Sequence, residues 1–362
     1  MILKDLGIEL LWFDSLGAKS ASLYLETALG GVVIDPGAAA MQPSYPLPDQ
    51  EKRELRRRAI MRIESYCRRA KTIIITHYHY DHHLLPDEPN IKDPKSMYLK
   101  GKLLVLKNPN VYINESQWNR ARLFLQKLMH ITGDDISNYL EEPPDVDFPD
   151  PVEKLNYAMS RNFGDYTPRR LELLEKGKRW FRKLVEHYWT SKPWIKNNII
   201  LCDNTRIIWG DEKKLELGDT MINILNPWFH GIEYDRTGWV TPILIIKKNN
   251  KIFYTSDLMG PQIEDYAYRI ADIKPDVIIA DGPPTYLFPY MLNRINLNRA
   301  IENMIHIIEN SKPKLIIYDH HLLREKRWKK RVEPVFKAAK RIGVCIITAA
   351  EYIGSRPLID II

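Results

Sequence analysis

The octet at residues 76–83, Thr-His-Tyr-His-Tyr-Asp-His-His, gathers several metal-binding side chains on one short stretch of chain. Three imidazoles and a carboxylate, at His77, His79, Asp81 and His82, combine borderline-soft nitrogens with one hard oxygen, which suits zinc and related transition metals. Side chains at i and i+2 of an extended segment point the same way, so His77 and His79 can bind one ion. Asp81 and His82 come where the chain turns, and they can face a second ion.

A cluster of histidines could instead be a surface feature or the polar start of a helix. The preceding stretch, residues 71–76, is apolar and rich in β-branched residues, which is typical of a strand buried in a sheet. A loop at the end of such a strand would present all four side chains at one place. The position of the octet therefore favours a metal site over both alternatives.

The octet resembles the HxHxDH signature of the metallo-β-lactamase superfamily, and the expected companions follow in the same order. Asp35 resembles the early aspartate at a strand end, His230 the third metal-binding motif, Asp257 the bridging carboxylate and His320 the last ligand. Taken singly, such residues are more often surface groups, turn formers or helix caps. Their order along the chain favours the ligand reading.

The resemblance implies a centre of two divalent ions, with zinc expected and manganese or iron as alternatives. Ions about 3.5–4 Å apart can share a water whose pKa falls toward about 7, which supplies hydroxide without a dedicated base. Asp81 would also take up or orient a proton. The implied ligands are His77, His79 and His230 for one ion, Asp81, His82 and His320 for the other, and Asp257 as the bridge.

Further residues are expected around this centre without touching the metals. Asp35 is expected to orient a ligand histidine or its loop, although a plain Asp-Pro-Gly turn is the alternative. His320 is preferred as the ligand over its neighbour His321 because it comes first after its strand. The remaining pocket candidates, each of which could equally serve packing, are Tyr78, Tyr80, His83, Tyr286, His321 and Arg324.

The elements that must position these residues fall into two β-rich parts. Strand-like runs bounded by Gly, Pro or Asp open the chain at 8–13, 22–26 and 32–35, and an Arg-rich helix precedes the run at 71–76. Residues 88–195 are rich in aromatics, prolines and charges, with helical periodicity at 166–190. Strands are expected again at 198–202, 206–209, 221–225, 242–247, 251–255, 277–280, 314–318 and 344–348, with helices at 292–310 and 326–341.

This order predicts two sheets packed face to face with helices outside, an α/β fold of the metallo-β-lactamase-like four-layer αββα type. The hydrolase domain would comprise residues 1–87 and 196–362, and residues 88–195 would form a mainly helical insertion or cap.

Composition places the chain among ordinary globular proteins, with 44% apolar and 27% charged residues and no low-complexity tract. No signal peptide or membrane span is expected, and three scattered cysteines fit a reducing compartment, so we expect a cytoplasmic protein without a membrane partner. The net charge of +7 is concentrated partly in the helix at 53–69. That helix is either a solvated face or a surface that meets nucleic acid or an anionic substrate.

Three classes of function follow from this sequence. The first is a hydrolase that cleaves an ester, lactone or related bond of a small molecule, with the insertion as a lid that supplies aromatic side chains. The second is a nuclease or phosphodiesterase that binds RNA or DNA through the Arg-rich helix. The third keeps the metals for binding or redox chemistry. The phrases at 77–83, 281–287 and 319–324 resemble an archaeal branch of predicted hydrolases, and that likeness selects no substrate.

Overall fold

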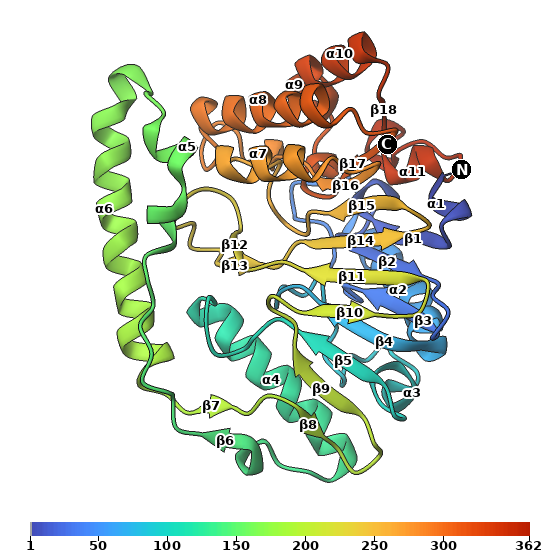
Figure 1. Cartoon of the computed structure of the whole chain (residues 1–362). Coiled ribbons are helices and arrows are strands. Elements are labelled where there is room, and N and C mark those ends of the chain that lie inside the picture. Colours follow the sequence, from blue (N-terminus) through green and yellow to red (C-terminus); the bar gives the residue numbers. More distant parts are fainter. Residues whose placement is uncertain (1) are drawn as a thin grey trace.

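The computed structural model describes residues 2–362, and its centre is a pair of seven-stranded sheets that face each other (Figure 1). The first sheet has the order β1 (Ile8–Phe13), β2 (Ala21–Leu25), β3 (Gly31–Ile34), β4 (Ala70–Ile75), β5 (Leu103–Leu106), β9 (Arg206–Trp209) and β8 (Ile199–Ile200). The second has the order β10 (Lys214–Glu216), β11 (Thr220–Ile224), β14 (Ile243–Lys247), β15 (Asn250–Tyr254), β16 (Val277–Asp281), β17 (Leu315–Asp319) and β18 (Cys345–Ile347).

Alternation along the strands divides the core into three layers. Ile74 and Ile279 point between the sheets and share one cluster, whereas Ile73 and Ile278 lie in the two outer clusters, beneath the helices. Strands apolar on both faces are what a sheet covered on both sides requires. The predicted four-layer αββα sandwich is therefore confirmed.

Helices cover the outer faces of both sheets. The apolar side of α2 (Asp49–Arg69) packs on the first sheet with α3 (Pro94–Tyr98) and α4 (Glu115–Thr132). The second sheet is covered by α7 (Glu264–Ile273), α8 (Arg294–Ser311) and α10 (Glu333–Ile342). The single helix expected at 326–341 is two helices, α9 (Trp328–Arg331) and α10, because Pro334 at the start of α10 cannot continue the hydrogen bonding of a preceding turn.

Parallel pairing sets the position of the loops that carry the motifs. Strands β3, β4, β5 and β9 pair in parallel, as do β15, β16, β17 and β18. Parallel strands bring their carboxyl ends to the same edge of a sheet. The segments after β3, β4, β15, β16 and β17 thus emerge at the edges where the two sheets meet.

The chain between the two β-rich parts forms α4, α5 (Asn156–Ser160), α6 (Thr167–Leu184) and the small pair β6 (Leu140–Glu141) and β7 (Trp194–Ile195). In Figure 1, α6 stands to one side of the sheets. β5, inside the stretch 88–195, is a member of the first sheet between β4 and β9, although the sequence indicated a mainly helical insertion there. The domain division at 87 and 196 stays a prediction.

Aromatic residues of this middle segment pack inward. Trp118, Phe181 and Trp189 are buried, and Trp189 contacts Trp239 of a hairpin formed by β12 (Trp228–Phe229) and β13 (Trp239–Val240). These rings fill a core between α6 and the hairpin, so they are not free to serve as a lid over a pocket. No described helix is both long and apolar enough to cross a membrane.

A buried ionic cluster ties the segment after β12 to the outer helices. Arg299 of α8 donates hydrogen bonds to Glu233 at 2.6 Å and to Glu264 at 2.6 Å, and Arg170 of α6 donates to Glu233 at 2.8 Å. Burial raises the pKa of Glu233, but the two arginines lower it more, so its pKa lies below the usual range. Glu233 follows His230 by three residues, so the cluster fixes the loop that carries this histidine.

Arg299→Met is expected to lower the free energy of unfolding by about 3–5 kcal/mol, because two buried carboxylates lose their shared counter-charge. The stabilisation from Glu233 is present above the ordinary glutamate pKa and is lost as the pH falls through the depressed one, so acid should destabilise the wild type more than the variant. Urea unfolding followed by circular dichroism measures both effects. The exposed Arg294→Met on the same helix should stay within about 0.5 kcal/mol of wild type, and equal losses in the two variants would contradict the prediction.

Candidate metal centre

Loops from both sheets bring the seven proposed ligands together. The octet follows β4, His230 follows β12, Asp257 comes three residues after β15, and His320 directly follows β17. Their ligand atoms form two groups that share Asp257, and within each group all atoms lie within 4.8 Å of one another. One group contains His77, His79, His230 and Asp257, and the other contains Asp81, His82, Asp257 and His320. Groups of this kind could hold metal ions.

Asp257 lies between the two groups. Its Oδ2 is 3.4 Å from His77 Nε2 and 3.2 Å from His230 Nε2, and its Oδ1 is 2.7 Å from His82 Nε2 and 3.1 Å from His320 Nε2. Each carboxylate oxygen therefore faces a different pair of imidazoles. This is the arrangement expected of a carboxylate that bridges two ions.

Several buried atoms at the centre have no hydrogen-bond partner among the described residues. They are His77 Nε2, His230 Nε2 and both carboxylate oxygens of Asp257. His82 Nε2 and His320 Nε2 lie 3.3 Å apart and aim at the same place. Buried polar atoms are almost always paired, because an unpaired one costs the free energy of its lost hydration. These atoms converge on two positions, so the residues fit a pair of cations.

The charges around Asp257 explain how the cluster is held. Burial raises the pKa of Asp257, but His82, His320 and His77 lower it more, and the net pKa lies well below the usual range. Burial lowers the pKa of His77 to about 4, whereas Asp257 and Asp35 outweigh burial at His82 and raise its pKa to about 10. His77 thus has a free lone pair at neutral pH. An ion at the second position would displace protons from His82 and His320.

Asp35 contacts His82, which is the position its predicted orienting role requires. Its carboxylate accepts hydrogen bonds from His82 Nδ1 at 2.9 Å, from the Thr76 backbone N–H at 2.7 Å and from the Tyr254 hydroxyl at 2.7 Å. Because a carboxylate can only accept, His82 Nδ1 carries a proton, and Nε2 is the nitrogen that faces the centre, where a bound ion would displace its proton. Asp35 has a φ of 51°, a left-handed conformation that aspartate adopts more readily than most residues.

Asp14, which sequence reasoning did not single out, does the same for His320. Its Oδ1 accepts from His320 Nδ1 at 2.8 Å, and its Oδ2 accepts from Arg324 Nε at 2.6 Å. Arg324 Nη2 also donates to Asp81 Oδ2 at 3.3 Å, and its Nη1 donates to the Tyr286 hydroxyl at 3.4 Å. Asp14 directly follows β1, as Asp35 follows β3, and that strand-end position was the only signal in the sequence.

His321 and His83 lie beside the centre with other partners. His321 Nδ1 donates to Asp281 Oδ1 at 3.0 Å, and the pair forms a third group with His320. Burial raises the pKa of Asp281 to about 7, since the lowering by His320 does not cancel it. His83 Nδ1 donates to the carbonyl of His79 at 2.9 Å, and burial lowers the pKa of His83 to about 3.

The two tyrosines of the octet differ in role. Tyr78 is buried, and its hydroxyl donates to the carbonyl of Lys107 at 2.6 Å, so it anchors the loop to the end of β5. Tyr80 is 38% exposed, and the guanidinium of Arg120 lies 4.8 Å from its ring centroid. Tyr80 is therefore the one of the pair that a solute can reach.

Gly37 allows the octet to turn at this place. A Cβ on this residue would lie 2.3 Å from the backbone nitrogens of His82 and His83 and 2.4 Å from the Asp81 carbonyl carbon. All three are backbone atoms, so they cannot move without displacing the loop. The Asp-Pro-Gly sequence after β3 thus supplies both the acceptor for His82 and the space in which that histidine sits.

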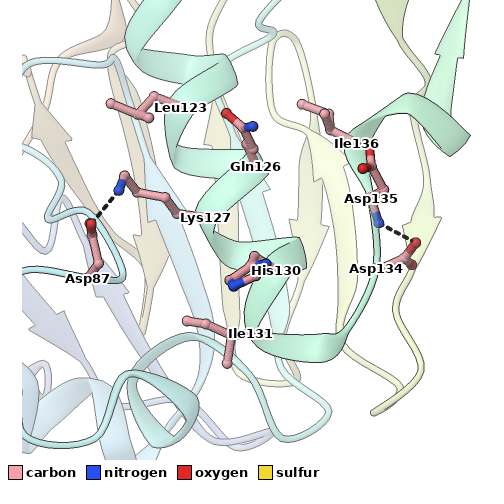
Figure 2. Close-up of a pocket in the computed structure, with 9 residues that line it drawn as sticks. All are labelled: Asp87, Leu123, Gln126, Lys127, His130, Ile131, Asp134, Asp135 and Ile136. Atoms are coloured by element: carbon pink, nitrogen blue, oxygen red, sulfur yellow. Dashed lines mark hydrogen bonds and ion pairs between the residues drawn. The ribbon is translucent and has the colours of Figure 1, made fainter.

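The surface has two hollows to compare, one next to this loop and one apart from it. The nearer one, about 550 Å³, is lined by Tyr80 and His83, by the apolar residues Ala38, Ala39, Leu84, Leu85 and Pro89, and by the charged residues Arg56, Asp87 and Glu88. The other, about 380 Å³, runs along α4 and is crossed by the ion pair between Lys127 and Asp87 (Figure 2). None of the seven proposed ligands lines either hollow, but the nearer one includes Tyr80 and His83 of the octet, whereas the hollow on α4 includes no residue of the octet.

Asp35→Asn is expected to weaken metal affinity about 10- to 100-fold, because His82 loses the charged acceptor that fixes its tautomer and ring orientation. Competition with a chelating zinc indicator measures the dissociation constants. Asp272→Asn, an exposed position on α7, makes the same chemical change away from the centre and should bind zinc like the wild type. Equal affinity in the Asp35 variant would show that the orienting contact does not matter.

Gly37→Ala is expected to cost the protein most of its bound metal, because the added methyl group displaces the backbone of the octet. Metal analysis after reconstitution gives the content per chain. Gly210→Ala is the matched control, since its Cβ would meet the Val105 and Ile224 side chains at 3.0 Å and 3.2 Å and no backbone atom of the octet. A folded Gly37 variant that keeps its full metal content would refute this role of the glycine.

Comparison with known proteins places the chain among archaeal relatives. No family model matches it. It is 28% identical over 346 residues to a UPF0282 protein of Korarchaeum cryptofilum, covering 95% of this chain and 88% of that protein. It is also 28% identical over 351 residues to a UPF0282 protein of Methanocaldococcus jannaschii, covering 96% of this chain and 91% of the relative.

Solved structures similar to this chain include three enzymes. Unliganded yeast PDE1 aligns with a TM-score of 0.42 at 10% identity, over 94% of this chain and 96% of that one. The short form of human tRNase Z aligns with a TM-score of 0.39 at 13% identity, over 86% and 92% of the two chains. CmlA, a diiron β-hydroxylase from Streptomyces venezuelae, aligns with a TM-score of 0.40 at 11% identity, over 91% and 51%.

Proposed function

We propose that this protein is a hydrolase with two divalent metal ions, and that zinc is the ion it takes. His77, His79 and His230 would hold one ion, Asp81, His82 and His320 the other, and Asp257 both. Five imidazole nitrogens and two carboxylates make a donor set that suits zinc better than the hard cations magnesium and calcium. The observation that carries the proposal is the convergence of unpartnered buried atoms on two neighbouring positions.

A pair of divalent ions, if bound here, would supply an acidified water molecule and polarisation of the bond to be cleaved. The residues of the chain fix this chemistry in place. Asp14 and Asp35 hold the Nδ1 protons of His320 and His82, so each imidazole turns its Nε2 toward the centre, where an ion would take the place of the Nε2 proton. Burial raises the pKa of Asp81, but His82, His320 and Arg324 lower it well below the usual range. Asp81 therefore stays ionised and is suited to hold an ion and to orient a proton.

The substrate we favour is a small molecule with an ester, lactone or related bond. The hollow of about 550 Å³ beside the octet lies within the size range of small-molecule sites and has mostly apolar walls. Its exposed ring, Tyr80, directly precedes Asp81 in the chain. The apolar part of a substrate could occupy this hollow while the scissile bond lies at the ions.

The basic helix gives weaker support to a nucleic-acid substrate than its sequence suggests. Arg56, Arg57 and Arg68 of α2 form ion pairs with Glu88, Glu54 and Glu64. Arg69 lies over the ring of Tyr66, with its guanidinium carbon 3.9 Å from the ring centroid. Several charges of this helix are thus already matched within the protein.

A nuclease or phosphodiesterase remains the second candidate because two arginines of α2, Arg53 and Arg58, form no ion pair within the described part of the chain. Backbone phosphates could bind there through charge alone. If this reading holds, cleavage of an oligonucleotide would decrease steeply with added salt and with loss of the two arginines.

The test is metal analysis of the purified protein followed by assays with p-nitrophenyl esters, lactones, bis-p-nitrophenyl phosphate and labelled oligonucleotides. We expect two zinc ions per chain, and we expect His79→Ala to lower the zinc content and abolish turnover of whichever substrate is cleaved. His130→Ala, an exposed histidine of α4, should change neither. Unchanged turnover in the His79 variant, or a folded protein that takes up no transition metal, would remove the proposal.

A further inference from the structure

Lys19 lies beside the candidate centre without a charge partner of its own. Its backbone N–H donates to the Ala39 carbonyl and its carbonyl accepts from the Ala39 N–H, both at 2.9 Å. The carbonyl of the next residue, Ser20, is 3.2 Å from His320 Nδ1. Main-chain contacts on both sides therefore place Lys19 next to the second group of ligands.

The charged groups that act on the Lys19 ammonium are Arg324, Asp81 and Asp14. Within residues 2–362 the ammonium makes no hydrogen bond and no ion pair, although Arg324 makes both with Asp14. Burial and the nearby Arg324 both lower the pKa of Lys19, because each disfavours its positive charge. Two cations are thus held near each other, and of the two carboxylates beside them Asp14 is already engaged by Arg324 and His320, while Asp81 accepts a longer contact from Arg324.

Lys19 stands where the centre opens to solvent. Five of the proposed ligands are buried, whereas His79 and Asp81 are partly exposed. Lys19 and Tyr286, which contacts Arg324, are partly exposed as well. Solvent therefore reaches Asp81 of the second group and part of Lys19, whereas Arg324 is buried and contacts Asp81 and Tyr286 from inside.

We propose that Lys19 and Arg324 together bind an oxyanion group of the substrate at this opening, so that the natural substrate carries a phosphate or a carboxylate close to the bond that is cleaved. This inference rests on the proposed function and narrows its substrate class. Arg324 is anchored through Nε and uses its outer nitrogens in longer contacts of 3.3 Å and 3.4 Å, so it retains N–H donors for an anion. Lys19 supplies a second positive charge, a point charge on a flexible side chain, for the same anion.

The competing explanation is that Lys19 only helps to hold Asp81. In that case its loss would weaken metal binding and would affect charged and neutral substrates alike. Metal content is therefore measured for each variant before any binding or activity is compared.

The first experiment measures binding of inorganic phosphate and of acetate to the zinc-loaded protein by calorimetry, and it requires no turnover. For whichever anion binds, Lys19→Met should weaken the affinity about tenfold, the loss expected for one charge-assisted contact, and Lys19→Arg should restore part of it. Lys340→Met, an exposed lysine of α10, should bind like the wild type. The anion that binds more tightly identifies the preferred oxyanion.

The second experiment compares a neutral ester, p-nitrophenyl acetate, with the carboxylate-bearing mono-p-nitrophenyl succinate and with bis-p-nitrophenyl phosphate. Lys19→Met should lower the ratio of kcat/KM for the charged substrate to that for the neutral one about tenfold, mainly through KM. Equal affinity of the Lys19→Met variant for both anions, or a loss of zinc that accounts for all its defects, would overturn the inference. If the wild type binds anions with Lys19-dependent affinity and hydrolyses nothing, the proposed function fails and the anion site stands.

Discussion

The arrangement of the centre depends on one buried carboxylate, that of Asp257. A charge removed from water costs several kcal/mol unless cations or donors surround it. Here the neighbouring imidazoles supply positive charge, and His82 Nε2 lies 2.7 Å from Oδ1 of Asp257, but neither carboxylate oxygen has a partner in good hydrogen-bond geometry among the described residues. Cations between the carboxylate and the imidazoles would replace this incomplete compensation with direct bonds. Asp14 and Asp35 do not belong to either ligand group. They support the centre by holding the Nδ1 protons of His320 and His82.

The scaffold delivers these groups because both sheets contribute. The octet follows a strand of the first sheet, whereas Asp257 and His320 follow strands of the second, so no ligand group is complete until the sheets have packed. Asp319, at the end of β17, accepts hydrogen bonds from the Ser15 N–H at 3.0 Å and the Ala349 N–H at 2.8 Å. It thereby joins the segment after β1 to the end of the second sheet. Burial raises the pKa of Asp319 to about 6, as expected for a carboxyl that serves as a structural acceptor inside the protein.

Much of this could be predicted from the sequence, and the failures have physical causes. Strands such as β1 and β9 were predicted to the residue because apolar runs end at polar or turn-forming residues. β5 is as long as β9, but its apolar run lies inside a stretch whose aromatics, prolines and charges indicated a mainly helical insertion. The break between α9 and α10 depends on one proline. At the centre, the octet and Asp35 stood in recognisable motifs, whereas Asp14 and Lys19 are single residues whose neighbours are about 300 positions away or in a different loop. Only the tertiary structure brings such residues into contact.

The centre also lowers the stability of the fold if it binds nothing. Asp35, Ser256 and His320, each at or near a strand end that leads to a ligand, have left-handed backbone conformations with φ between 51° and 58°. Such conformations cost on the order of 1–3 kcal/mol each in residues other than glycine. Buried charged clusters can often be replaced by apolar residues without loss of stability. A protein that used this region only for packing would gain from such replacement. The strained turns, the imidazoles without hydrogen-bond partners and the incompletely compensated carboxylate are therefore better explained by bound cations than by the stability of the fold.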